Sequence, residues 1–499
     1  MQTIPNQSKV IIVGAGIGGI ATAARLARQG CQVTVVEKNE NSGGRCGRMH
    51  LKGYTFDTGA TMFLMPEVYA ETFAALGERM EDHLDLRRAD PTYHLTFPDD
   101  STMQLSPDMH KMLLQMEAME PGSFEKMLHY LAEGRRIYQL SVANLLGVDF
   151  RKLTDFINPR MLALFLQLKA TSLHTDYIRR FFKDPRLQMA FTFQDMYMGL
   201  SPYQSPATYS LMQYTELGDG LYFPMGGMYS VTEALTRLAE MAGVTFLYSN
   251  AVEKILVEDN AATGVQLENG QVLSAGTVVA NADLGYVYKN LLPADDPSAG
   301  IVDRKEYGCS TIMFYWGLDK QYPGIGLHNL YLHGDYRQSF VDLFDKMTLS
   351  DEPNFYIHAP VRLDASMAPA GHDAWYIALP VGRDNHKLKQ DWPALQKKAR
   401  AFVLKRLAEL GLPDVESHIQ AEVSFIPDSW QRRYNLPFGS THGLSHKLSQ
   451  MAYLRPHNRH SRYHNLYFVG ASTHPGTGVP TVLISARLAA ARVLEDIKN

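Results

Sequence analysis

KVIIVGAGIGG (residues 9–19) is the stretch that decides the fold. Its apolar, β-branched half ends at glycines and continues into small residues that predict a helix over 20–27, an order typical of a buried parallel strand feeding a crossover helix. Gly14 permits a tight turn, Gly16 lets the backbone approach a pyrophosphate, and Gly19 lets the helix pack closely on the strand. The amino terminus of the helix can therefore hold phosphates.

A second apolar strand, predicted over 33–36, ends in Glu37. A carboxylate at this place can accept hydrogen bonds from both hydroxyls of an adenosine ribose. A glycine-rich turn alone could belong to another α/β protein. Strand, helix, strand and acid together favour a dinucleotide-binding unit, and a second glycine cluster at Gly43-Gly44-Arg45 follows it.

Length and composition narrow the class of protein. A chain of 499 residues exceeds one ordinary core and predicts two intertwined domains. A hydrophobic content of 45% and a charged content of 20% are typical of a globular enzyme, and the net charge of −4 predicts no nucleic-acid partner. The cysteines Cys31, Cys46 and Cys309 show no CxxC spacing, which predicts a reducing compartment and no disulfide or metal site.

Targeting segments are not expected. The apolar stretch near the amino terminus lacks a basic region before it, so we predict no secretory signal. The sequence contains no uncharged apolar run near the ~20 residues that cross a bilayer. These patterns predict a cytoplasmic protein without a spanning helix.

The middle of the chain mixes strands and helices. Tyr93–Thr96 and Thr102–Leu105 predict a hairpin of a second domain, and 108–193 predicts a helical portion with helix starts at Ser123 and Asp184. Within that portion, residues 160–169 are apolar nearly all round and bracketed by basic residues. This segment is either a buried core helix or a monotopic membrane contact.

The second half returns to β-structure. Predicted strands lie at 245–247, 251–257, 278–280, 309–318, 355–359, 375–379 and 421–426, with an Asn269-Gly270 hairpin and helices over 229–242 and 392–410. The carboxyl terminus repeats the opening order, with a strand at 466–469 and a helix over 481–497. The nucleotide-binding domain is therefore expected to be discontinuous.

Five blocks in the right order resemble the bacterial-type phytoene desaturases, which are carotenoid desaturases of the flavin-dependent amine oxidase superfamily. The blocks are the opening fingerprint, Gly43-Gly44-Arg45, FPMGGM (223–228), RPHNR (455–459) and NLYFVGASTHPGTGVP (465–480). The resemblance covers essentially the whole chain, and its carboxyl-terminal block is far more specific than a glycine motif. This chain departs from the family pattern at Thr477 and Thr481, where glycine is common, so the substrate and the number of desaturation steps stay open.

The resemblance implies an α/β fold with a Rossmann-like, discontinuous FAD-binding domain, a mixed-sheet substrate domain and a helical portion that touches the membrane. The FAD-binding domain is expected over 1–90, 220–300 and 460–499. The substrate domain is expected over 91–219 and 301–459, with the helical portion at 108–193. Leu164, Phe165 and Leu168 are the expected membrane contacts.

The resemblance also implies FAD-binding residues. Glu37 is expected to bind the ribose, the fingerprint and Arg45 the pyrophosphate, and the Val252 backbone the adenine. Gly470-Ala471 and Gly478-Val479 are expected near the ribityl chain and the flavin ring. The full expected set is Gly14, Ala15, Gly16, Gly18, Gly19, Glu37, Lys38, Gly44, Arg45, Val252, Gly470, Ala471, Gly478 and Val479.

The expected reaction removes two hydrogens from adjacent carbons of phytoene, with FAD supplying the hard step. The protein then mainly needs a dry apolar passage, for which 191–200 and 313–316 are candidates, although such stripes are more often plain core. Asp155, Arg160, Asp195 and His474 are candidates for proton handling. Spacing singles out none of them, so no catalytic residue is assigned.

Several alternatives stay open. Within the same fold, the enzyme could desaturate a C30 or hydroxylated carotenoid, or isomerise a carotenoid between cis and trans forms. Two alternatives belong to other functional classes: an amine oxidase and a non-enzymatic flavin-binding scaffold. The expected partners are a polyene substrate, a membrane surface and an electron acceptor that is either oxygen or a quinone, and the oligomeric state is left undefined.

Overall fold

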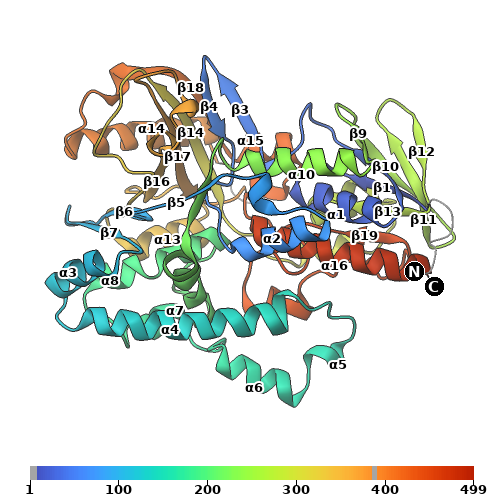
Figure 1. Cartoon of the computed structure of the whole chain (residues 1–499), viewed down its shortest axis with the longest axis horizontal. Coiled ribbons are helices and arrows are strands. Elements are labelled where there is room, and N and C mark those ends of the chain that lie inside the picture. The colour runs from blue at the N-terminus through green and yellow to red at the C-terminus, as the bar shows by residue number, and fades with distance from the viewer. Residues whose placement is uncertain (1–7, 385–389, 499) are drawn as a thin grey trace.

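The computed structural model describes residues 8–384 and 390–498. A parallel sheet, a larger mixed sheet and a helical portion make up the molecule (Figure 1). This arrangement agrees with the predicted α/β class. The division into domains at 90, 220, 300 and 460 stays a prediction.

The parallel sheet collects strands from distant parts of the chain in the order β19-β13-β1-β2-β9. Its strands are β1 (Lys9–Val13), β2 (Gln32–Val36), β9 (Thr245–Leu247), β13 (Thr277–Ala280) and β19 (Leu466–Phe468). β1 pairs in parallel with β2 on one side and with β13 on the other. The fingerprint strand therefore lies in the middle of the sheet, where both of its faces are covered.

Helices cover this sheet. They are α1 (Ile17–Arg28), α2 (Pro66–Ala75), α10 (Tyr229–Met241) and α16 (Val479–Lys498). α1 packs against both α10 and α16, and small side chains such as Ala21 and Ala24 permit this close approach. The predicted helix over 481–497 begins earlier, at Val479, so Pro480 lies in the first turn, where its missing N–H costs nothing.

The mixed sheet has the order β18-β14-β17-β16-β15-β6-β7. Its strands are β6 (Tyr93–Thr96), β7 (Thr102–Leu105), β14 (Ser310–Leu318), β15 (His328–Tyr331), β16 (Phe355–His358), β17 (Asp373–Val381) and β18 (Ile419–Phe425). β6 and β15 pair in parallel, and the other neighbours are antiparallel. The predicted hairpin and the predicted strands of this region are confirmed, with ends that shift by a few residues.

Smaller sheets complete the β-structure. They are β3 (Arg48–Leu51) with β4 (Tyr54–Asp57), β5 (Leu86–Arg88) with β8 (Tyr222–Pro224), and β10 (Val252–Glu258) with β11 (Ala261–Leu267) and β12 (Val272–Ser274). The predicted hairpin at Asn269-Gly270 is confirmed by the antiparallel pair β11 and β12. β4 lies where the sequence pattern predicts a short strand and turn over 54–61, whereas β3, β5 and β8 were not predicted.

The remaining helices lie mostly in the helical portion, which Figure 1 shows below the sheets. They are α3 (Met109–Met119), α4 (Ser123–Ser141), α5 (Leu153–Phe156), α6 (Pro159–Gln167), α7 (His174–Ile178), α8 (Pro185–Ala190), α9 (Leu211–Gln213), α11 (Leu284–Tyr286), α12 (Ala299–Asp303), α13 (Tyr336–Phe344), α14 (Trp392–Glu409) and α15 (Pro427–Tyr434). The predicted starts at Ser123 and Asp184 are confirmed, since α4 begins at Ser123 and the Asp184 side chain caps α8.

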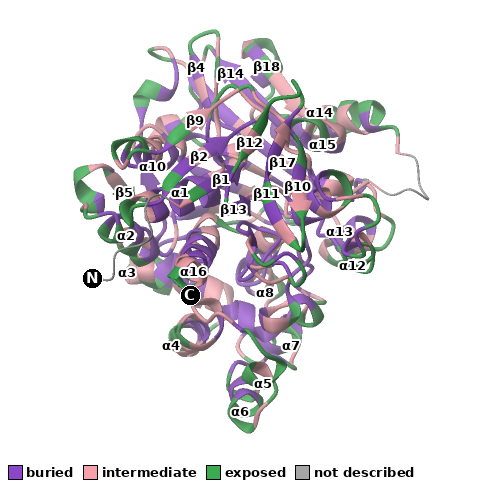
Figure 2. Ribbon diagram, turned by 90° about the vertical axis from the view of Figure 1, so that its right-hand side faces the viewer, coloured by how far each residue is buried: buried purple, intermediate pink, exposed green. Residues whose placement is uncertain are grey.

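The burial of α6 contradicts the reading of residues 160–169 as a fully buried core helix and corrects the choice of two membrane-contact residues; the membrane contact itself stays a prediction. Leu164 and Leu168 are 6% and 1% exposed and belong to a core cluster, so they were wrongly predicted as membrane contacts. Leu162 and Leu166 are 66% and 60% exposed, so α6 is not a fully buried core helix either. Figure 2 shows this exposed side along α5 and α6 at the lower end of the molecule.

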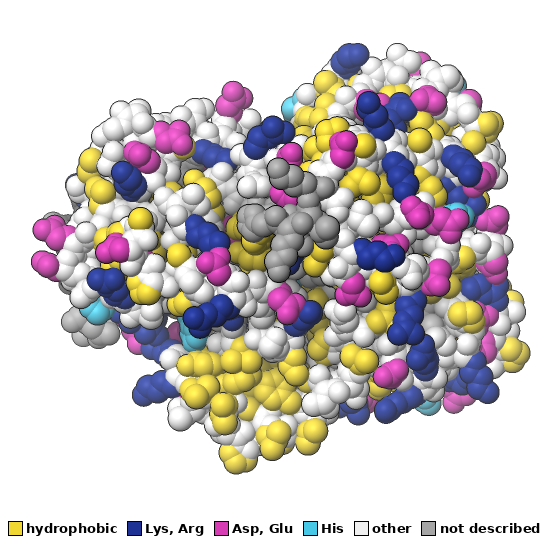
Figure 3. All heavy atoms as spheres, turned by 180° about the vertical axis from the view of Figure 1, so that it is seen from behind, with side chains coloured by type: hydrophobic (Ala, Val, Ile, Leu, Met, Phe, Trp, Pro, Cys, Tyr) yellow, Lys and Arg dark blue, Asp and Glu magenta, His cyan; other side chains and the backbone are white. Residues whose placement is uncertain are grey.

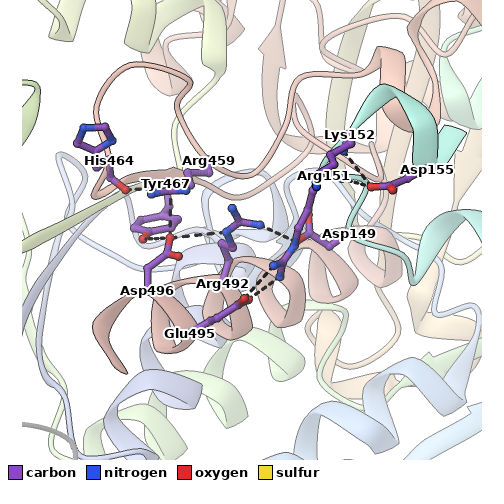
Figure 4. A network of polar contacts seen from close by, with 10 residues as sticks. All are labelled: Asp149, Arg151, Lys152, Asp155, Arg459, His464, Tyr467, Arg492, Glu495 and Asp496. Atoms are coloured by element: carbon purple, nitrogen blue, oxygen red, sulfur yellow. Dashed lines mark hydrogen bonds and ion pairs between the residues drawn. The ribbon is translucent and has the colours of Figure 1, made fainter. Parts of the chain in front are cut away.

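Ion pairs tie the segment before α5 to α16 (Figure 4). The Arg151 guanidinium binds both carboxylate oxygens of Glu495, at 2.9 and 2.6 Å, and also contacts Asp149. Arg492 of α16 lies 3.4 Å from the same Asp149 carboxylate. Exposed pairs contribute only ~0–1 kcal/mol each, so these contacts orient the segment more than they stabilise it.

Among the described residues, no helix is both long and apolar enough to cross a membrane.

Candidate functional site

The turn between β1 and α1 tolerates no side chain at its glycines. Gly14 has φ +99°, and a Cβ on Gly19 would lie 2.2 Å from the Gly14 carbonyl oxygen. Gly16 precedes α1 with extended backbone (φ −73°, ψ 167°), and no side chain in the described part of the chain caps the helix there. The first N–H groups of α1 are thus left for another acceptor, as expected for a phosphate-binding turn.

Glu37 lies at the end of β2, beside this turn. It is 6% exposed, and its Oε2 accepts a hydrogen bond from the Ala15 N–H at 2.8 Å. Its Oε1 accepts from the Asn39 backbone and side chain, at 2.8 and 2.7 Å. The carboxylate is therefore fixed in orientation before any ribose hydroxyl reaches it.

The second glycine cluster folds against the first. Gly43 donates its N–H to the Ala15 carbonyl at 2.8 Å, and a Cβ on Gly43 would lie 2.6 Å from the Cys46 carbonyl oxygen. Arg45 donates from Nη1 to the Thr441 carbonyl at 2.7 Å. Burial raises the pKa of the neighbouring Cys46 thiol to about 12, which keeps it protonated and unreactive.

One cavity of about 660 Å³ joins these loops to the interior of the mixed sheet. The predicted FAD-binding residues that line it are Gly14, Gly16, Gly18, Glu37, Lys38, Gly44, Arg45, Val252, Gly470, Ala471, Gly478 and Val479. Ala15 and Gly19 do not line this cavity. They act behind its wall, where Ala15 bonds Glu37 and Gly19 packs on Gly14.

Asp283 is a cavity residue that the sequence reasoning missed. It is 7% exposed, its Oδ1 caps a short turn through the Gly285 N–H, and its Oδ2 has no hydrogen-bond partner among the described residues. Burial raises the pKa of Asp283 to about 6, although the charge of Arg45 opposes the rise. Its position three residues after β13, at the carboxyl edge of a parallel sheet, was the available signal.

Arg455 is a second missed residue, and it holds the carboxyl-terminal wall of the cavity. Its guanidinium is 1% exposed and donates to the carbonyls of Leu444, Ser445, Gln450, Ala471 and Thr473, at distances between 2.6 and 3.4 Å. Ala471 itself lines the cavity. Arg455 therefore fastens the family-like carboxyl-terminal block to the loop before it.

Thr477 and Thr481, the departures from the family pattern, both line the cavity. The Thr477 hydroxyl donates to the His442 carbonyl at 2.5 Å, and the Thr481 hydroxyl donates to the Thr477 carbonyl at 2.7 Å. Both hydroxyls are thus bonded within the protein, and both add bulk where glycine would leave space.

The far part of the cavity is apolar and aromatic. The predicted segments 191–200 and 313–316 contribute Phe193, Met196, Met198 and Met313 to its lining, and Phe340 lines it as well. Phe191 and Trp316, at the ends of those segments, are buried in hydrophobic core clusters. The middle of 191–200 and Met313 therefore line the cavity, and their use as a substrate passage stays a prediction.

The four candidates for proton handling lie elsewhere in the described structure, since the residues that line the cavity include none of them. Asp155 accepts backbone bonds at the start of α5, and Arg160 is exposed and bonds Asn144. Asp195 is fully buried against His174, and His474 packs edge-on against Phe150. Asp155 is thus a helix-start residue.

The residues present fit an extended, doubly charged dinucleotide such as FAD. The uncapped helix terminus and Arg45 suit the pyrophosphate, and Glu37 suits the ribose. The unpartnered Asp283 oxygen is an acceptor for a hydroxyl group.

We expect Glu37→Ala to weaken FAD binding by about 1.5–3 kcal/mol, because a charge-assisted hydrogen bond is lost. Quenching of flavin fluorescence on titration of the apoprotein measures this loss. Glu40→Ala is the matched control, since Glu40 is exposed and lies outside the cavity lining. Equal affinity in the Glu37 variant and the wild type would show that this carboxylate does not contact the cofactor.

The chain is similar to known flavoproteins in sequence and in fold. Residues 17–494 match the family described as flavin containing amine oxidoreductase. A zeta-carotene-forming phytoene desaturase of Myxococcus xanthus is 46% identical over 97% of this chain and 94% of its own. A phytoene desaturase of Neurospora crassa is 41% identical over 97% of this chain and 84% of its own. A putrescine oxidase variant has the same fold, with a TM-score of 0.65 and 13% identity over 98% of this chain and 99% of its own.

Proposed function

Because the chain belongs to the family of flavin-containing amine oxidoreductases, we propose that it is an FAD-dependent desaturase that introduces C=C bonds into phytoene. The observation that carries the proposal is that one cavity joins the dinucleotide fingerprint to an apolar passage lined by aromatic and methionine side chains. The two desaturases reported above support the choice of a carotenoid.

FAD, when bound, supplies the acceptor for a hydride. The protein's own residues bind and orient the dinucleotide and the polyene, and they exclude water. The turn at Gly14 to Gly16, Arg45 and Glu37 hold the dinucleotide, and Arg455 keeps the opposite wall in place. Phe193, Met196, Met198 and Met313 offer a polyene apolar contacts and few hydrogen bonds, which fixes its position by shape.

Expression in cells that already make phytoene tests the proposal. We expect those cells to accumulate a pigment that absorbs at longer wavelength and weighs two mass units less for each step, counted from the loss of two hydrogens. Unchanged phytoene would contradict it. A carotenoid of unchanged mass with altered geometry would favour an isomerase, and turnover of a C30 or hydroxylated polyene in place of phytoene would redefine the substrate.

A soluble amine distinguishes the amine oxidase reading, because it would reduce the flavin of an amine oxidase and leave that of a desaturase oxidised. A flavin that no substrate reduces would favour a non-enzymatic scaffold. We propose oxygen or a membrane quinone as the terminal electron acceptor.

We also propose that the protein is cytoplasmic and attaches to a membrane through one apolar face. This apolar face consists of exposed side chains on and around α5 and α6, namely Leu153, Ile157, Leu162, Leu166 and Leu173. Figure 3 shows hydrophobic side chains gathered at the lower end of the molecule, where Figure 1 places α5 and α6. Exposed basic residues lie nearby in the chain at Lys152, Arg160, Arg179 and Arg180, which suits anionic lipid headgroups.

The double variant Leu162→Glu with Leu166→Glu should no longer bind liposomes, because burial of one leucine side chain in an apolar phase is worth about 1.5–3 kcal/mol. Flotation of the protein with liposomes on a density gradient measures the bound fraction. The matched control places glutamate at Met241 and Val272, which are 69% and 53% exposed but lie on other elements. Flotation of the α6 variant at the wild-type level would exclude this face as the contact.

A further inference from the structure

A carboxylate is buried directly behind the wall of the apolar passage. Glu216, in the π-helical segment Tyr214–Gly220, is 0% exposed and forms no ion pair within the described part of the chain. Its Oε2 accepts a hydrogen bond from the Gln194 side chain at 3.1 Å, and its Oε1 lies 3.5 Å from the Tyr93 hydroxyl. The Tyr93 and Tyr197 hydroxyls are hydrogen-bonded to each other.

Tyr93 and Tyr197 connect this carboxylate to the cavity, because both side chains line the cavity and Glu216 does not. They come from different elements, Tyr93 from β6 and Tyr197 from the 3₁₀ segment Phe193–Met198. An unbroken path of hydroxyl groups thus runs from the passage to Glu216. A proton can move along such a path without water entering the passage.

Further polar groups extend the path into the protein. Gln194 accepts from the Gln213 side chain at 2.8 Å, and the Tyr130 hydroxyl donates to Gln213 at 3.2 Å. Tyr130 bonds His174 at 2.8 Å, and His174 bonds Asp195 at 3.0 Å. Each of these side chains is 0% exposed. Asp195, a candidate from the sequence, is therefore the inner end of a network that begins at the cavity.

We propose that Tyr93, Tyr197 and Glu216 form the proton exit of the desaturation, an inference that rests on the proposed function. One carbon of the substrate gives up a hydride, which carries two electrons to FAD. The neighbouring carbon gives up a proton, and the electron pair of its broken C–H bond becomes the new π bond. A tyrosine hydroxyl on the cavity wall takes this proton while passing its own to the Glu216 carboxylate, so the tyrosine is regenerated and the proton ends on Glu216.

The electrostatics of the cluster agree with this direction of transfer. Burial raises the pKa of Glu216 to about 7, and hydrogen bonds from Gln194, Tyr197 and Tyr93 oppose the rise. Tyr356 of β16 and His328 of β15 face the cluster from neighbouring elements, with the His328 ring 5.6 Å from the Tyr93 ring and 2.6 Å from the Tyr356 hydroxyl. Burial holds the pKa of each tyrosine hydroxyl well above its usual value and the pKa of His328 well below its own, so these groups keep their charge near neutral pH. Within this cluster, Glu216 is therefore the group that changes charge near neutral pH. Because the ionised form accepts the proton, flavin reduction should be slow below pH 7 and rise to a plateau above it.

Glu216→Gln tests this role in the FAD-loaded protein mixed anaerobically with phytoene liposomes. We expect about a 100-fold slower flavin reduction and loss of the rise near pH 7, since a positioned base typically contributes 10²- to 10⁴-fold. The double variant Tyr93→Phe with Tyr197→Phe should show the same loss, and adding Glu216→Gln to it should slow the reaction no further. Glu67→Gln is the matched control, because Glu67 also bonds a tyrosine, Tyr138, but lies outside the cavity lining.

A readout independent of turnover accompanies these rates. The infrared difference spectrum of the protein between pH 6 and pH 8 should contain a protonated-carboxyl band that Glu216→Gln removes and Glu67→Gln keeps. Unchanged FAD content in every variant shows that the cofactor site is intact, and if Glu216→Gln fails to fold, the tyrosine variants carry the test.

Wild-type rates and pH profile in Glu216→Gln would overturn the proton exit while leaving desaturation in place. A slower rate with an unchanged pH profile would assign Glu216 a packing role and also overturn it. A wild-type protein whose flavin no polyene reduces would instead refute the proposed function, and this inference with it.

Discussion

Gly16→Val should purify almost without FAD. Gly16 lines the cavity, and a Cβ there would already lie 2.9 Å from the Asn281 side-chain nitrogen, which donates to the Gly14 carbonyl at 3.0 Å. The branched side chain also takes the space through which a pyrophosphate reaches the start of α1. Loss of two charge-assisted hydrogen bonds weakens binding by roughly 4 kcal/mol, or about 1,000-fold. Flavin absorbance per protein and titration of the apoprotein with FAD measure the effect.

The backbone at Gly16 makes this test specific. Its φ of −73° suits any residue, so the substitution changes space and leaves the backbone conformation unstrained. Gly276→Val is the control for the fold, because Gly276 has open space around its Cβ position and no positive φ. Full FAD occupancy in Gly16→Val would place the cofactor away from this turn.

Arg455→Met should destabilise the protein by about 3–5 kcal/mol. The substitution leaves buried carbonyl oxygens without their donor, and each unsatisfied polar group costs about 1–3 kcal/mol. Burial lowers the pKa of Arg455 to about 10, so the guanidinium stays charged at neutral pH and its bonds remain charge-assisted. Urea unfolding followed by flavin fluorescence measures the change, and FAD should be released early because Ala471 lines the cavity.

Two further variants separate this role from a general effect of charge. Arg455→Lys should recover part of the loss, since one ammonium group reaches fewer carbonyls than the planar guanidinium. Arg459→Met lies in the same sequence block, but Arg459 is partly exposed and pairs with Asp496, so it should cost no more than about 1 kcal/mol. Equal stability of the Arg455 and Arg459 variants would contradict the role of Arg455 in holding the carboxyl-terminal block to the loop before it.

Local patterns in the sequence were enough for the elements that build the dinucleotide site. The β-branched run at 9–13 and its glycines depend on neighbours a few residues away, and the structure places a strand, turn and helix there. The carboxyl-terminal strand could be predicted for the same reason. The ends of α16 could not, because Pro480 is tolerated inside a first turn as well as before a helix.

Contacts between distant segments could not be predicted from one sequence. Arg455 meets carbonyls of the segment 444–450 and of Ala471 and Thr473, and Glu216 meets side chains from β6 and from 193–198, so neither has a local signature. Only part of the predicted segment 313–316 lines the cavity, for a physical reason. Side chains alternate along a strand, so Met313 faces the cavity while Trp316 points to the opposite face of β14.

The composition of the apolar segment 160–169 does not predict which of its side chains are buried. With apolar residues on every side, its pattern does not say which face packs inward. Leu164 and Leu168, two of the three residues chosen as membrane contacts, are core, and Phe165 is half-buried against them. Packing of Met161, Leu164 and Leu168 against neighbouring elements decides the face and leaves Leu162 and Leu166 outside.

A hydride that passes directly from phytoene to FAD bound in the cavity would reduce the flavin without any nicotinamide. Anaerobic mixing of the FAD-loaded protein with phytoene liposomes, without nicotinamide, tests it through flavin absorbance and the mass of the recovered carotenoid. We expect the oxidised-flavin absorbance to disappear and the carotenoid to lose two hydrogens for each flavin reduced. A flavin that stays oxidised beside a carotenoid of unchanged mass would contradict it.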